Sequence, residues 1–191
     1  MTNFKPEWLT AVFTLGLVVT GVYAFRYAQG QINEYRDAAQ VQNLVSLDTE
    51  FWNEPLLTYR KVCAEKRQKG VKDPDEEDEL LQFFDKVALV DNRGYLNDED
   101  VYDRFAYYIL SLYKDNQESI DEELKYDPTN YSNLLSLVPR LETIDARRHG
   151  TLAKPTKDDM LDYWKEEAAL ATVNSESRAV EKNAKQVPTK P

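Results

Sequence analysis

The chain has 191 residues, of which 42% are hydrophobic and 30% charged, so it can form a packed core and does not match the composition of a disordered protein. Its net charge is −10, and residues 31 to 150 carry 15 basic against 26 acidic side chains. An acidic domain without a basic stripe argues against nucleic acid and anionic headgroups as main partners, and it favours basic proteins or serves solubility alone.

The first predicted element is an apolar helix from Trp8 to Phe25, which contains no charged side chain. Its eighteen residues would extend about 27 Å, close to the roughly 30 Å of a membrane's hydrocarbon core. Trp8 stands at one end and Tyr23 with Tyr27 at the other, where interfacial aromatic residues belong. We therefore predict one transmembrane helix within an anchor of residues 1–28. Its span positions are Trp8, Val12, Leu15, Val18, Val22 and Phe25.

Two other interpretations of this segment stay open. Val22-Tyr23-Ala24 has the small residues that a signal peptidase accepts, although the apolar run is longer than usual and its N-terminal flank is barely basic. The second interpretation is a helix buried in a protein core, although apolar runs of such helices are usually shorter than this one. Lys5 precedes the run, whereas Arg26 and Arg36 follow it, so the positive-inside rule favours a cytoplasmic C-terminal domain.

Small residues recur every four positions along one side of the predicted span. They are Gly16, Thr20, Ala24 and Ala28. Such stripes let membrane helices approach closely, so they predict a helix-packing face for protein partners or a homo-oligomer.

The rest of the chain predicts an all-α fold: a helical stalk over residues 29–47, a compact bundle of five to six helices over 48–172, and a flexible polar tail over 173–191. Asn53 is expected to cap the helix that begins near Pro55, and Asp73-Pro74 to open the next one. The acidic run after Pro74 is typical of a helix N-terminus and its dipole rather than of a calcium site.

Gly94 suggests a calcium-binding loop at first sight, but the register fails because Leu89 would stand at the first carboxylate position. We instead expect Gly94 to form a turn and Asn97 to cap the following helix. That helix has the clearest apolar stripe of the chain, which predicts the centre of the core. Its members are Val101, Phe105, Tyr108, Ile109 and Leu112.

A short acidic helix is predicted around Ile120 and Leu124. Asp127-Pro128 should then open a helix that Pro139 bends or divides and that ends before Gly150. Thr156 with Asp159 resembles a capping box at the start of a last helix.

Motifs for catalysis, metals and cofactors are not found. One cysteine, Cys63, in a helical apolar pattern suggests a buried small side chain, and one histidine, His149, at a helix C-terminus suggests a surface or dipole-matching group. Zinc lacks ligands, six glycines leave little material for a phosphate loop, and we predict no metal and no cofactor. Carboxylates are too abundant for any pair to be singled out as an active site.

Three stretches, together with the N-terminal span, resemble a bacterial family of small membrane-anchored helical proteins that is catalogued only as a domain of unknown function. The stretches are LDTEFWNEPLLTYRKV, LLQFFDKVALVDNRGYLNDEDVYDRFAYYILSLY and DPTNYSNLLSLVPRLE, and the likeness covers roughly residues 8–145. It implies a membrane anchor, a helical fold and a bacterial setting, and it carries no catalytic residue.

These observations together predict a protein-interaction or regulatory module without catalytic activity, anchored by a single pass in a bacterial inner membrane with its C-terminal domain in the cytoplasm. An accessory subunit of a larger membrane complex is one alternative. A hydrolase with an unrecognised carboxylate site is the other.

Overall fold

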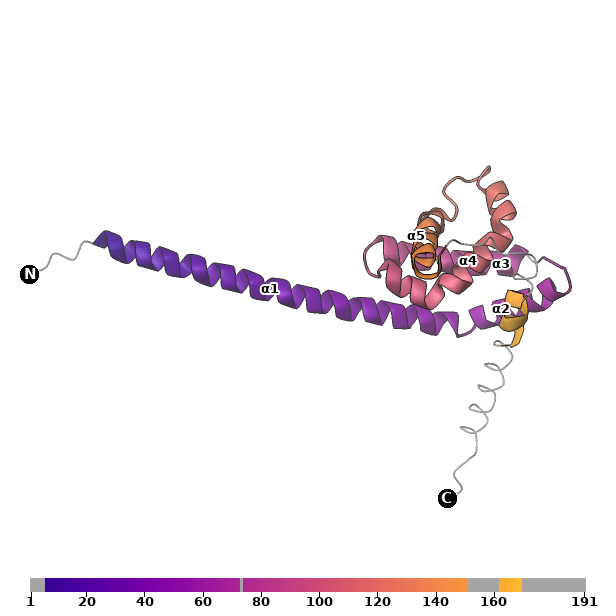
Figure 1. Ribbon diagram of the computed structural model, residues 1–191, viewed down its shortest axis with the longest axis horizontal. Coiled ribbons are helices and arrows are strands. Elements are labelled where there is room, and N and C mark those ends of the chain that lie inside the picture. The colour runs from indigo at the N-terminus through magenta and orange to yellow at the C-terminus, as the bar shows by residue number, and fades with distance from the viewer. Residues whose placement is uncertain (1–5, 73, 151–161, 170–191) are drawn as a thin grey trace, which may run out of the picture. The chain divides into compact units, whose positions relative to one another are not determined.

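The computed structural model describes residues 6–72, 74–150 and 162–169, without the side chains of residues 6–11 and 74. Regular structure in these ranges is entirely helical, which confirms the all-α prediction (Figure 1). The helices are α1 (Pro6–Phe51), α2 (Leu56–Gln68), α3 (Pro74–Asn92), α4 (Asp98–Glu123) and α5 (Ser132–His149), and residues 162–169 are also helical.

The chain divides into two compact units, Met1–Gln42 and Asn43–Pro191. The first unit is the larger part of α1, which is helical through the predicted span and on through the stalk. Gly30 does not interrupt it, because a helix tolerates a single glycine at a cost of only about 1 kcal/mol relative to alanine.

Among residues with described side chains, no helix contains an 18-residue stretch apolar enough to cross a membrane. The predicted span was Trp8 to Phe25, and the side chains of residues 8–11, Trp8 among them, lie outside the description. A stretch of that length starting at Val12 takes in Arg26. The transmembrane helix is thus not confirmed by the described residues.

The second unit is built around α3, which packs against α2, α4 and α5. Its centre is aromatic: the ring of Phe51 lies 5.6 Å from Phe83, 5.6 Å from Phe84 and 5.8 Å from Phe105, measured between ring centroids. The three contacts are stacked, tilted and edge-to-face respectively, and aromatic pairs of this kind stabilise beyond the apolar area that they bury. The predicted stripe of α4 lies here, with Val101, Phe105, Ile109 and Leu112 buried and Tyr108 half-buried.

Two predicted helix starts are confirmed, and the predicted cap of α2 is wrong. Asn97 caps α4 by accepting a hydrogen bond from Asp100 N at 2.9 Å, and Pro74 is the first residue of α3. Asn53 does not cap α2, because its side-chain amide donates back to the Thr49 carbonyl of α1 at 2.6 Å.

The region after residue 113 also differs from the prediction. The expected short acidic helix is the last part of α4, which continues without a break to Glu123. No glycine or proline interrupts the polar stretch, and the buried Asn116 amide is satisfied by donating to Leu112 O at 3.1 Å.

Asp127 does not start α5 either, because its carboxylate accepts from the Thr129 backbone amide and hydroxyl and so closes a turn before the helix. Helix α5 begins at Ser132, and Pro139 lies inside it without dividing it. Leu137, Val138 and Leu141 are buried beside this proline, and their packing outweighs the lost backbone hydrogen bond. Thr156 and Asp159 of the expected capping box lie outside the described residues.

Candidate functional site

The apolar run of α1 is exposed on every side of the helix within its own unit. Leu17, Val18 and Val19 point in three directions about 100° apart, yet 73%, 57% and 51% of their surfaces are exposed. Val12, Leu15, Val22 and Phe25 are exposed as well. A helix that is apolar all round is normally covered by protein or lipid, which makes this run a candidate contact surface.

The predicted small-residue face contributes no contact inside the first unit. A side chain added at Gly16 would meet nothing within 4 Å among the described residues, and Thr20 donates its hydroxyl to Gly16 O of the same helix at 2.8 Å. Ala24 and Ala28 are exposed on the same face. The stripe is therefore accessible to an outside partner, and its role stays a prediction.

Neither reactive side chain singled out in the sequence is arranged for catalysis. Cys63 is fully buried in α2, and burial raises the pKa of its thiol to about 12, so the nucleophilic thiolate is disfavoured. His149 is exposed in the last turn of α5 beside Arg147 and Arg148. Across the described ranges, no three His, Cys, Asp or Glu side chains gather in a way that could hold a metal ion.

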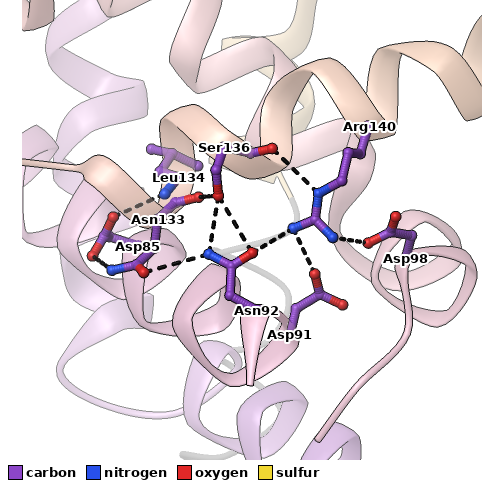
Figure 2. Close-up of polar contacts among 8 residues, drawn as sticks. All are labelled: Asp85, Asp91, Asn92, Asp98, Asn133, Leu134, Ser136 and Arg140. Atoms are coloured by element: carbon purple, nitrogen blue, oxygen red, sulfur yellow. Dashed lines mark hydrogen bonds and ion pairs between the residues drawn. The ribbon is translucent and has the colours of Figure 1, made fainter. Parts of the chain in front are cut away.

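A polar network joins the end of α3, the start of α4 and the middle of α5 around Arg140 (Figure 2). The Arg140 guanidinium donates to Asp98 and to Asn92 Oδ1, and its Nη2 lies 2.8 Å from Asp91 Oδ2 without the alignment of a hydrogen bond. One cation thus serves two carboxylates at the meeting point of three helices.

Asp91 is the most perturbed member of this network. Its side chain is 2% exposed, and burial raises the pKa of its carboxyl group, with Arg140 opposing the shift and Asp98 adding to it. A buried carboxyl group with a raised pKa can act as a general acid, but here Arg140 lies directly against it. The arrangement fits a structural clamp better than the carboxylate site of a hydrolase.

Asp85 of α3 forms the other end of this network, where it caps α5 from outside (Figure 2). Its two carboxylate oxygens accept from Leu134 N and from Asn133 Nδ2, both at 2.9 Å. The residue at the usual capping position, Tyr131, has left-handed backbone angles and makes no side-chain cap. Helix α3 therefore supplies the acceptor that α5 lacks. Gln82, Asp85, Lys86, Leu89, Asn130 and Tyr131 line an open hollow of about 460 Å³ beside it.

Among the described residues, the most deeply buried ion pair is that of Arg60 in α2 and Glu167, whose side chains are 2% and 1% exposed. The guanidinium donates through Nε at 2.8 Å and Nη2 at 3.1 Å to the two carboxylate oxygens. Aromatic rings surround it, with the Phe51, Trp52 and Tyr108 centroids 3.9, 4.2 and 5.1 Å away. Bidentate pairing and ring stacking are what an arginine can provide and a lysine cannot.

Arg67, two helical turns further along α2, forms a second contact with the same C-terminal segment. It pairs with Glu77 at 2.6 Å and Asp115 at 3.1 Å, and it faces the ring of Trp164 at 5.8 Å. Asp115 in turn accepts from Trp164 Nε1 at 3.0 Å. Both arginines interrupt the apolar stripe that Leu56 and Cys63 share, and a charged residue in such a stripe is the sequence signal that could have revealed them.

The chain matches no family model, no curated protein and no solved structure. The likeness to a bacterial membrane-anchored family stays a prediction from the residues, and function has to be argued from the surfaces described above.

Proposed function

We propose that this protein is a membrane-attached protein-interaction module, in which the N-terminal part of α1 inserts into a bacterial inner membrane and the helical unit faces the cytoplasm. The observation that carries the proposal is the exposure of apolar side chains on all sides of α1 between Val12 and Phe25. Water is a poor solvent for such a helix, whereas lipid covers all its sides at once.

The helical unit supports binding rather than turnover. Its buried charges face partners instead of a vacant site: Arg60 pairs with Glu167, and Asp91 lies against the partly exposed Arg140. Binding by shape and charge requires only a stable surface, and the acidic balance of residues 31–150 suits a basic protein partner. A dedicated subunit of a larger membrane complex would use the same anchor, and native sizing after detergent extraction would then find it always with a stoichiometric partner.

Orientation rests on the flanking charges. Arg26 and Arg36 follow the apolar run, and only Lys5 precedes it, so the side that carries the helical unit is the more basic one. Basic flanks are retained in the cytoplasm.

The test is Val18→Arg in the full chain, followed by carbonate extraction of membranes. The nine Leu, Val and Phe residues between Trp8 and Phe25 contribute roughly −3 to −5 kcal/mol to the free energy of membrane insertion, and a central arginine costs about 3 kcal/mol. The variant should therefore leave the membrane in large part. Val41→Arg is the matched control, because Val41 is equally exposed on α1 but lies in its polar part. Equal carbonate resistance of the Val18→Arg variant and the unchanged chain would refute the anchor.

A further inference from the structure

A regular row of uncharged residues runs along one side of α1, from the apolar run into the polar part that follows it. The row alternates steps of three and four positions, which is the spacing of a heptad repeat. Helix α1 passes through it without a break. We call this row the stalk seam. Its members are Val18, Gly21, Phe25, Ala28, Ile32, Tyr35, Ala39 and Gln42, and all of them are exposed within their unit.

The charged residues of the stalk all lie outside the seam. At 100° per residue, Arg26, Glu34 and Asp37 fall on the far side of the helix, and Arg36 flanks the seam. The polar part of α1 is therefore two-sided, with its charges turned away from one continuous uncharged row. This is the pattern of one strand of a coiled coil.

The stalk also needs packing that its own unit does not supply. Within residues 26–42 no two opposite charges stand three or four positions apart, so side-chain pairs along the helix do not support it. Gly30 weakens it further. The two largest seam side chains of the stalk, Ile32 and Tyr35, are 64% and 77% exposed. Such a helix gains its stability when another element covers its apolar side.

A second copy of the same stalk matches this side in charge. Residues 26–42 carry two basic and two acidic side chains, whereas residues 31–150 as a whole are acidic. In a parallel pair, the positions that flank the seam meet five residues apart, which places Gln31 opposite Arg36 of the second copy. The Gln31 side-chain oxygen can accept from that guanidinium. No two like charges are brought together by this register.

Membrane attachment favours the same arrangement. Copies that insert by the same end stand parallel, with equal residues at equal depth, and this is the register in which the seam matches itself. The seam from Phe25 to Gln42 spans only eighteen residues. Confinement to a membrane raises the effective concentration of the copies, which compensates for so short an interface.

We propose that α1 pairs with α1 of a second copy of this chain through the stalk seam, as a parallel two-stranded coiled coil. The proposal rests on the proposed membrane attachment for its register, and it names the partner and the contacting side. The seam is a different surface from the small-residue stripe: Gly16 and Thr20 lie on other sides of the helix, and the two rows share only Ala28.

The test is disulfide crosslinking of the full chain in native membranes. Single cysteines replace seam residues in Ile32→Cys, Tyr35→Cys and Ala39→Cys, and residues outside the seam in the controls Asn33→Cys, Glu34→Cys and Asp37→Cys; all six positions are exposed. Equivalent seam positions of a parallel pair approach within disulfide reach, so oxidation should give roughly fivefold more linked dimer from the seam cysteines than from the controls. Cys63 is buried, and the unchanged chain measures the background.

Three results would overturn the proposal. One is an equal dimer yield from all six positions. Another is crosslinking of the seam cysteines only to other proteins. The third is a higher dimer yield from Gly16→Cys and Thr20→Cys than from the seam cysteines, which would assign the contact to the small-residue stripe.

A charge placed in the seam gives a second measurement. Ile32→Glu should lower the Tyr35→Cys dimer yield roughly fivefold, because it buries a carboxylate against its own copy. Asn33→Glu adds the same charge one position away, outside the seam, and should leave the yield nearly unchanged. An undiminished yield with Ile32→Glu would also overturn the proposal.

The membrane anchor and the seam can fail separately. If the unchanged chain is released by carbonate, the six cysteine variants are oxidised in solution at high protein concentration instead. A yield that still follows the seam would remove only the anchor. Equal yields there would overturn the seam as well.

Discussion

Replacing Asp85 by alanine tests whether α5 is capped by another helix. Asp85 accepts hydrogen bonds from Leu134 N, in the first turn of α5, and from Asn133 Nδ2. Loss of a capping acceptor costs typically about 1 kcal/mol, and loss of the second hydrogen bond roughly another 1 kcal/mol. Alanine is the better residue inside α3 by about 0.5 kcal/mol, which offsets part of this. We expect the free energy of unfolding to fall by roughly 1 to 2 kcal/mol.

The assay is urea unfolding followed by circular dichroism, with the midpoint and the slope fitted separately. Glu79→Ala is the matched control, because Glu79 is an exposed acidic residue of the same helix and its replacement also removes one negative charge, with a smaller gain in helix propensity than Asp85→Ala. It should alter stability by no more than about 0.5 kcal/mol.

Asp85→Asn separates the two hydrogen bonds. Asparagine can still accept from Leu134 N, but its amide would face the Asn133 amide, which is also a donor. Its stability should therefore lie between those of the unchanged chain and Asp85→Ala. If Asp85→Ala is no less stable than the Glu79→Ala control, the capping argument is wrong.

Three further predictions concern the buried groups. Arg140→Met should lower the free energy of unfolding by about 3 kcal/mol at neutral pH, because it leaves the Asp91 carboxylate buried without its cation. Burial raises the pKa of Asp91, so this loss of stability relative to the unchanged chain should shrink as the pH falls. A loss that stays the same in urea titrations at different pH values would contradict this. Cys63 should react with an aromatic disulfide reagent far more slowly in the folded chain than in urea, and equal reaction rates in the two states would show that α2 is not packed as described. Because burial raises the pKa of the Cys63 thiol to about 12, the free energy of unfolding should decline as the pH rises from about 9 towards 12. Phe105→Ala should lower the free energy of unfolding by roughly 3 to 5 kcal/mol, whereas Tyr126→Ala, at an exposed aromatic side chain, should stay within about 0.5 kcal/mol, and similar losses in the two variants would argue against the aromatic core.

Local patterns determined much of the helical architecture. The stripe of α4, the Asn97 cap and the positive backbone angle of Gly94 depend on residues a few positions apart, which the sequence displays directly. For the same reason the burial of Cys63 and the basic last turn of α5 could be predicted. The length of α4 was harder to predict from the sequence. Its polar stretch around Asn116 is held in the helix by side chains from other elements, such as Arg67, which donates to Asn116 Oδ1.

Contacts between residues distant in the sequence were decided only by the tertiary structure. Asp127 has the neighbours of a helix cap, yet the acceptor for α5 is Asp85, which packing brings across from α3. Arg60 and Glu167 are more than a hundred positions apart, and nothing local marks them as partners. The sequence therefore determined which segments are helical and which side of each is apolar, because those properties follow from near neighbours. Which buried charges meet, and which helix caps another, follows from the packing of the whole unit.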